Sequence, residues 1–394
     1  MPLVISAIGP LRPLRAQGGH RKSVRRCLKA DIRRCDALKS DFCAGLLSPA
    51  RYNPGKAASF FVISRSGGAR ALTEEEKAVV ETLERIFMPL AYSKRQKMKD
   101  DGRFVHYTSA DNAVKIITTR RFWMRNARCM NDYMELTFGH QHLVQIFQKN
   151  DQELQKAFIE TLEPLAMGLG GRILKHFDEW WQNLQFNTYI GSISEHDPSE
   201  NKYGRLSMWR AYGGNSAKAA LILRMPLDQQ ANGLRVLLSP VAYLGMEEME
   251  REFRATLQSI KDNHATLAAL KTEDIFNTAF YMLVMAALSL KHRGFSEERE
   301  WRMICLPDAL PSEHVERSVE VIAGVPQTVF KIPLENKPDQ EICGISIPDL
   351  IDRVIIGPSV YPTPIFDAFS NIMKDAGISD PHSRLTISDI PLRT

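Results

Sequence analysis

The sequence predicts an α+β protein in which helices and strands occupy separate stretches of the chain. Residues 132–184 and 246–291 have helical apolar periodicity, whereas short strands follow one another after Phe186 and again after Glu300. Strands that do not alternate regularly with helices are typical of α+β folds and not of doubly wound parallel sheets. With 394 residues, 44% of them hydrophobic, the chain is long enough to bury a substantial core.

The first 72 residues form a basic leader with neither helical nor strand periodicity. Residues 1–70 hold 14 Lys and Arg against 3 Asp, which leaves 37 basic and 43 acidic residues in a mildly acidic remainder. A basic segment of this kind is expected to be disordered. Three interpretations are open: an organelle transit peptide, a nucleic-acid-binding arm, or sequence that precedes the true start codon.

Ordered structure is expected to begin at Thr73. This residue can cap a helix, Glu76 completes a capping box three positions later, and an apolar face follows. Residues 73–100 are therefore predicted to be a helix and a Lys-rich linker. Residues 101–394 are predicted to form a single α+β domain with helical insertions at 132–184 and 246–291.

The segment RFVHYTSADNAVKIITTRRFWMRN predicts a strand, a helix and a second strand. Phe104–Thr108 is aromatic or β-branched, Ser109 can cap the helix, and Phe122–Met124 begins the second strand. A further helix is expected to start at Asn131 or Asp132 and to end near residue 148. Another helical region, residues 151–184, is expected to be interrupted at residues 168–171.

The second half of the domain alternates between strand patterns and one long helical region. NTYIGSIS and AKAALILRM read as strands, and SMWRAYGGN between them as a compact aromatic turn. The apolar stretch Ile275–Leu290 is too short to cross a bilayer and predicts a buried helix, so no membrane partner is expected. The later predicted strands are Trp301–Leu306, Val329–Ile332, Gly344–Ile347 and Arg353–Ile356.

Six cysteines are present, and none forms a C-x-x-C pair or has metal-ligand spacing. We therefore expect free thiols in a cytoplasmic protein that has no bound metal.

Charged residues crowd the segment GFSEEREWRMI, directly before an apolar run. If the whole segment were a strand, Glu298, Glu300 and Arg302 would share one face. One interpretation is an exposed rim on which Glu300 pairs with Arg302. The other is a cleft lined by two carboxylates about 7 Å apart, at about 3.3 Å per residue, that could bind a sugar hydroxyl and activate a nucleophile.

Two further motifs have both a structural and a functional interpretation. His106 and Thr108 share a strand face just before a helix N-terminus that could bind an anion, although a lone histidine in an apolar strand is usually a core residue. Trp209 and Tyr212 lie beside a Gly-Gly pair. They could form a stacking wall for a planar ring, or they could close one end of the core.

Six blocks occur in an order that resembles the bacterial domain-of-unknown-function family numbered twenty-nine seventy-one, over about residues 103–372. These blocks are HYTS, FWMRNARCMNDYMEL, YIGSISE, SMWRAYGG, GFSEEREWRM and RVIIGPSV. The order of the parts is also similar, more distantly, to that of ADP-ribosyltransferase-like domains: an early His-Tyr-Thr strand, a serine-containing strand, a tyrosine and a late E-x-E. That likeness implies a split mixed or antiparallel sheet flanked by helices.

The distant resemblance implies that NAD is the substrate and that ADP-ribose is transferred to an unknown acceptor or to water, as in a toxin or a phage-defence protein. Breaking the bond between ribose and nicotinamide develops positive charge at the anomeric carbon, which a carboxylate stabilises. The implied roles are ribose binding for Glu300, acceptor activation for Glu298 and adenosine-side ribose binding for His106. Thr108, together with Ser192 or Ser194, would support the cleft, and Tyr212 would stack on nicotinamide.

A non-catalytic module that binds a nucleotide or nucleic acid is the alternative function. His106 with its helix start, together with Arg120, Arg121, Arg125 and Arg128, could contact phosphates, although these arginines also fit a solvated face. An inactive ligand-binding relative of the transferase fold is a further alternative. A nuclease would need clustered acids for metal-assisted chemistry, which the sequence lacks.

Overall fold

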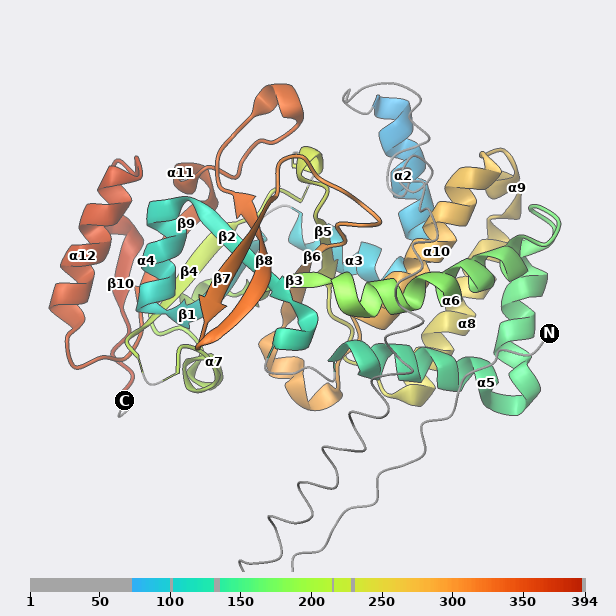
Figure 1. Ribbon diagram of the computed structural model, residues 1–394, viewed down its shortest axis with the longest axis horizontal. Helices are drawn as coiled ribbons and strands as arrows, with labels where there is room; N and C mark the ends of the chain where they lie inside the picture. The colour runs from blue at the N-terminus through green and yellow to red at the C-terminus, as the bar shows by residue number, and fades with distance from the viewer. Residues whose placement is uncertain (1–72, 100–101, 131–134, 215, 228–230, 392–394) are drawn as a thin grey trace, which may run out of the picture. The chain divides into compact units, whose positions relative to one another are not determined.

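The computed structural model describes residues 73–99, 102–130, 135–214, 216–227 and 231–391 (Figure 1). All of them lie in one compact unit, residues 55–394. The predicted leader and the predicted helix start at Asn131 or Asp132 lie outside the described residues.

Within the described residues, ten strands form one mixed sheet in the order β10-β9-β4-β1-β3-β2-β8-β7, with β6 and β5 branching from β3. The pairs are antiparallel except for β10 with β9, which is parallel. The predicted α+β class and mixed sheet are therefore confirmed. The strands are β1 (Arg103–Ser109), β2 (Arg121–Asn126), β3 (Tyr189–His196), β4 (Lys218–Arg224), β5 (Leu237–Pro240), β6 (Glu300–Cys305), β7 (Glu316–Ile322), β8 (Val325–Pro333), β9 (Ile351–Ile356) and β10 (Leu385–Ile387).

The sheet divides at β3. One edge of β3 pairs with β6. The other edge pairs with β2 at Tyr189 and Ile190, and with β1 only from Ser194 onward. Because no ladder joins β1 to β2 among the described strands, the sheet separates into an arm that contains β1, β4, β9 and β10 and an arm that contains β2, β8 and β7 (Figure 1).

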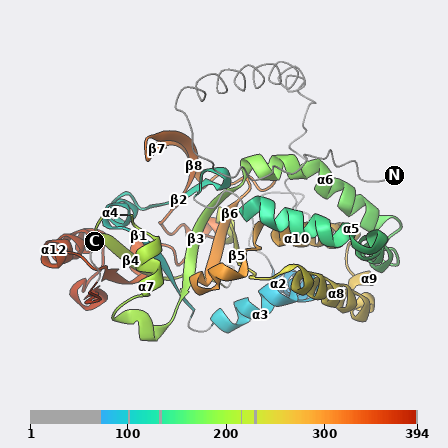
Figure 2. The ribbon, with the colours of Figure 1, turned by 90° about the horizontal axis from the view of Figure 1, so that it is seen from below.

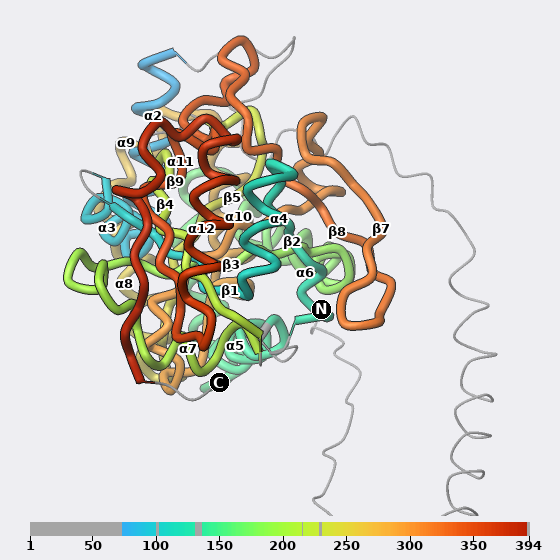
Figure 3. The backbone as a smooth tube through the Cα atoms, turned by 90° about the vertical axis from the view of Figure 1, so that its left-hand side faces the viewer, coloured from blue at the N-terminus to red at the C-terminus, as the bar shows by residue number. Residues whose placement is uncertain are grey.

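Helices cover the sheet in two groups. The helices α4 (Ala110–Thr119) and α12 (Pro362–Asp375) pack against each other beside the first arm (Figure 3). The helices of the larger group lie beside β3, β5 and β6 (Figure 2). They form one of the hydrophobic cores together with Ile190, Leu237 and Ile304 of these strands. The members of this group are α2 (Glu74–Phe87), α5 (Glu135–Leu162), α6 (Leu169–Asn187), α8 (Met246–Asp262), α9 (His264–Ala268) and α10 (Thr272–Leu288).

Local sequence signals account for several element boundaries. Thr73 and Glu76 form the predicted capping box at the start of α2, and the Ser109 side chain accepts from the Asn112 N–H at the start of α4. α10 is the predicted buried helix. Among the described helices, none is both long enough and apolar enough to cross a membrane.

Three predictions about secondary structure are wrong or incomplete. The aromatic turn is a short helix, α7 (Leu206–Ala211), and Gly213 and Gly214 follow it with positive φ angles. The predicted strand Gly344–Ile347 is instead a loop that leads into α11 (Ile347–Leu350), whose second residue is a proline. The linker after α2 contains a further helix, α3 (Pro89–Met98), which begins with proline.

Gly139 lies where α5 crosses α10. A Cβ at this position would lie 2.1 Å from the Ala287 carbonyl oxygen. We therefore expect Gly139→Ala to force the two helices apart and to lower the free energy of unfolding by about 1–3 kcal/mol. Gly171→Ala is the matched control, because a Cβ there meets nothing within 4 Å, and helix propensity predicts a gain of up to about 1 kcal/mol. Urea unfolding measures both, and equal effects of the two substitutions would contradict the packing argument.

Candidate functional site

Glu298 and Glu300 belong to different elements. Glu298 ends a 3-10 turn, Arg293–Glu298, and Arg299 then has a φ of 46° before β6 begins at Glu300. The predicted spacing of both carboxylates along one strand is therefore wrong, and strand alternation relates only Glu300 and Arg302.

Lys291 joins the two carboxylates instead. Its ammonium lies 2.6 Å from Glu298 Oε2 and 3.3 Å from Glu300 Oε2. The Lys291 N–H donates to the Ala242 carbonyl at 3.0 Å, just after β5, and the Val241 N–H donates to the Glu300 carbonyl at 2.9 Å. These backbone contacts bring the segment after α10 to the beginning of β6.

Glu300 is the centre of a buried ion network. Its side chain is 6% exposed, and it accepts from Ser192 Oγ at 2.6 Å and from Arg302 Nε at 3.1 Å. Burial by itself raises the pKa of Glu300. The charges of Arg302 and Lys291 and the hydrogen bonds from Arg302 and Ser192 outweigh burial and lower the pKa to about 2. Glu300 is therefore a carboxylate at neutral pH.

Arg302 connects this network to the end of α10. Its side chain is fully buried, and its guanidinium donates to the Leu288 carbonyl at 2.6 Å. The last carbonyls of a helix lack partners within the helix and favour a nearby cation. The interpretation of Glu300 and Arg302 as an exposed rim pair is therefore wrong, because both side chains lie under the helical layer.

Two tyrosines and one phenylalanine border the network. The Tyr243 hydroxyl accepts from the Glu300 N–H at 2.8 Å. Tyr212 is half-buried, and burial and the nearby Glu298 carboxylate raise its pKa. The Lys291 ammonium lies 4.8 Å from the centre of the exposed Phe295 ring. With a side chain that is 16% exposed, Glu298 is the more accessible of the two carboxylates.

The sheet separates His106 and Thr108 from the carboxylates. Ser194 pairs with both Val105 and Glu300, so the side chains of Val105 and Glu300 lie on the same face of the sheet. Because side chains alternate along a strand, His106 points to the opposite face. His106 Nδ1 donates to the Ser192 carbonyl at 3.0 Å, and its ring lies edge-on to Phe122. Burial lowers the pKa of His106, partly opposed by that hydrogen bond.

Thr108 is buried and accepts from Asn112 Nδ2 at 3.3 Å, near the start of α4. The structure thus brings together five of the predicted site residues and leaves out the side chains of His106 and Thr108. The five are Ser192, Ser194, Tyr212, Glu298 and Glu300.

Sequence reasoning missed Lys291 and Tyr243. Neither lies in a motif, and both reach the site only because the segments after β5 and α10 pair at Ala242 and Leu290. The one available signal was a lysine directly after a strongly apolar helix, where a solvated role is the ordinary expectation.

The predicted arginine cluster is engaged locally. Arg121 pairs with Glu316 at 3.4 Å and with Glu335 at 3.2 Å, Arg125 donates to Gln327, and Arg128 lies over the Phe186 ring. These contacts favour a solvated face over a phosphate-binding surface.

The described residues include no group of His, Cys, Asp and Glu that could hold a metal ion. Their three cysteines, Cys129, Cys305 and Cys343, are free thiols, and burial raises the pKa of Cys305 to about 12.

The fold and this site define a mixed α+β protein with a buried network of carboxylate, lysine and arginine side chains at the division of its sheet. Residues 208–303 match the family DUF2971, described as a protein of unknown function, which confirms the family resemblance found in the sequence. The matched segment runs from α7 into β6 and contains Tyr212, Lys291, Glu298 and Glu300. No curated protein and no solved structure matches the chain, and the likeness to ADP-ribosyltransferases is not confirmed.

Proposed function

We propose that this protein binds NAD at the Glu298 and Glu300 site and breaks the bond between nicotinamide and ribose, passing ADP-ribose to an acceptor or to water. The observation that carries the proposal is the 2.6 Å hydrogen bond from Ser192 Oγ to Glu300 Oε1. It joins the serine of the middle strand to the late E-x-E motif, the two parts that the resemblance implies for one site.

The charges of the network suit this chemistry. The transition state carries positive charge at the anomeric carbon, and Glu300, whose pKa is lowered, supplies a fixed negative charge. Glu298 is accessible enough to meet the ribose or the acceptor, and Lys291 holds its carboxylate in place. Glu298 and Glu300 line neither the pocket of about 780 Å³ nor the pocket of about 150 Å³.

Nicotinamide release from NAD by the purified full-length chain tests the proposal. We expect release by the wild type and a loss of about 100-fold or more in Glu298→Gln and in Glu300→Gln. Glu297→Gln changes an exposed neighbour and is expected to retain the wild-type rate. If Glu300→Gln has the native circular dichroism spectrum and full activity, the assigned role is wrong.

A binding module without catalysis is the second candidate, and the burial of Glu300 favours it. A carboxylate that Lys291, Arg302 and Ser192 already engage can serve to position the sheet against α10. If neither the wild type nor the variants release nicotinamide, titration with NAD and with single-stranded RNA at several salt concentrations distinguishes the ligands. Nucleic-acid binding weakens steeply with salt, whereas NAD binding depends on it far less.

A further inference from the structure

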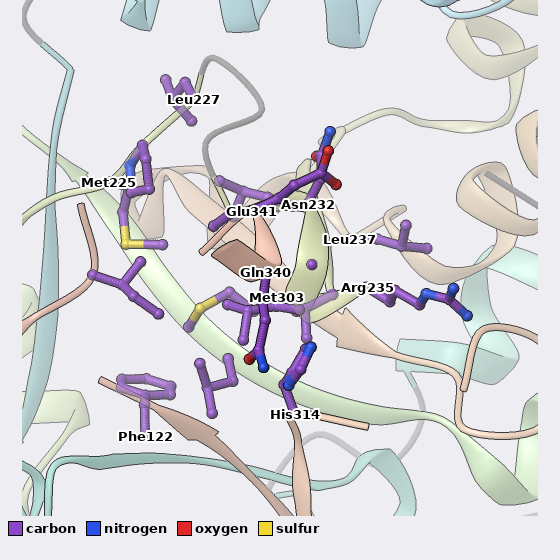
Figure 4. A pocket seen from close by; sticks show the side chains of 18 of the residues that line it. Phe122, Met225, Leu227, Asn232, Arg235, Leu237, Met303, His314, Gln340 and Glu341 are labelled. Atoms are coloured by element: carbon purple, nitrogen blue, oxygen red, sulfur yellow. The ribbon is translucent and has the colours of Figure 1, made fainter. Parts of the chain in front are cut away.

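A pocket of about 780 Å³ lies beside β5 and β6, and side chains of both hydrophobic cores line it (Figure 4). Phe122, Leu223 and Met303 line its floor and belong to the core on the side opposite Glu300, whereas Leu237 and Leu310 of the lining belong to the core on the Glu300 side. The residues of the ion network do not line this pocket, so the two are separate. Its volume is within the range of about 300–1,000 Å³ that is usual for small-molecule sites.

The lining is mostly aliphatic. Besides the floor, it includes Met225, Leu237 and Leu310, together with the half-buried Leu227 (Figure 4). Flexible aliphatic and thioether side chains fit an aliphatic ligand body better than a flat polar ring.

Two segments hold part of the rim in place. Gly233 approaches Gln340 so closely that a Cβ at Gly233 would lie 1.9 Å from the Gln340 carbonyl oxygen. The Gly233 N–H also donates to the Glu341 carbonyl at 3.2 Å. Because the two segments are joined through their backbones, this side of the pocket is formed before any ligand binds.

The polar groups of the lining carry an excess of negative charge. Glu84 is paired with Arg95 at 3.0 Å, but within the described part of the chain no base forms an ion pair with Glu313, Asp339 or Glu341. The opposing cation is Arg235, whose guanidinium donates to the Pro311 carbonyl at 3.0 Å, and the ionisable His314 lies on the same rim. Three carboxylates against one guanidinium favour a positively charged head group.

We propose that this pocket binds an amphipathic organic cation, with an aliphatic body on the apolar floor and an ammonium group at the carboxylate rim. The size and apolar lining of the pocket indicate the aliphatic body, and the rim carboxylates indicate the ammonium group. It does not depend on NAD chemistry at Glu298 and Glu300.

Calorimetric titration of the full-length chain at neutral pH with octylamine, octanol and octanoate tests this proposal, with octylamine and octanoate below their micellar concentrations and octanol below its solubility limit. The three probes share one chain length and differ in head group. We expect octylammonium to bind about tenfold more tightly than octanol, a difference of about 1.4 kcal/mol in binding free energy. Octanoate should bind most weakly of the three. Tighter binding of octanoate, equal binding of all three probes, or binding of none would overturn the proposal.

Variants locate the binding. The double substitution Asp339→Asn and Glu341→Gln is expected to remove most of the preference for octylammonium and to leave octanol binding unchanged. Asp375→Asn, an exposed change outside the pocket lining, is the matched control and should leave all three affinities unchanged. If the double variant keeps the full preference, the rim carboxylates do not select the ligand.

Discussion

Arg302→Met is expected to lower the free energy of unfolding by about 3–5 kcal/mol. The substitution keeps an unbranched chain in the core but removes the guanidinium that binds Glu300 Oε1 at 3.1 Å and the Leu288 carbonyl at 2.6 Å. A buried carboxylate would then depend on Lys291 and Ser192, and a carbonyl at the end of α10 would lose a donor. Urea unfolding monitored by tryptophan fluorescence measures the change.

Arg293→Met is the matched control for this experiment. Arg293 also pairs with a glutamate, Glu248 at 3.3 Å, but its side chain is 67% exposed. Exposed ion pairs contribute less than about 1 kcal/mol, so this variant should unfold near the wild-type midpoint. If both variants lose the same stability, burial is not what makes the Arg302 contacts strong.

Acid is expected to destabilise the protein in a way that depends on Glu300. Its folded pKa of about 2 lies below the ordinary glutamate pKa of 4.5, so the folded state favours the carboxylate. The resulting stabilisation, about 3 kcal/mol, is fully present above pH 4.5 and is lost as the pH falls through the folded pKa. The free energy of unfolding should therefore fall by up to about 1.4 kcal/mol per pH unit from this residue below pH 4.5.

Comparison of variants isolates this contribution. The glutamine side chain of Glu300→Gln does not take up a proton in this pH range, so the stability of the variant should depend less steeply on pH between 6 and 3, whatever its stability at pH 6. Glu297→Gln, an exposed change, should retain the wild-type slope. Parallel curves for the wild type and Glu300→Gln would show that another group carries the acid sensitivity.

Substitutions of the two glutamates are expected to affect activity and stability differently. Glu300 is tied into the core by three side chains, whereas Glu298 lies at the accessible edge of the network. A loss of nicotinamide release in Glu298→Gln without a large loss of stability would therefore be direct support for the proposed chemistry. If only Glu300→Gln loses activity, either the chemistry or the fold of the site is impaired. The unfolding measurement distinguishes these two explanations.

Three strands were not predicted from the sequence. β5 and β10 have only four and three residues, too few to show alternation. β7 carries the exposed Val319 and Val321 and forms because it pairs with β8 along its whole length, from Glu316 to Ile322. Strand formation of this kind depends on a partner that local sequence does not identify.

The sequence by itself determined what local forces control. The Thr73 and Ser109 caps satisfy backbone donors within one helical turn, and the apolar residues of α10 require burial wherever the helix lies. The family resemblance and most strand positions also follow from local patterns.

Only the tertiary structure decided which of these elements share a site. Register along β3 put Ser192 with Glu300 and turned His106 to the other face, because a strand alternates its side chains and its pairing decides which neighbours they meet. Lys291 came between two glutamates because the segments after β5 and α10 pair with each other. Long-range pairing depends on the whole fold, so no short stretch of sequence could have specified that contact.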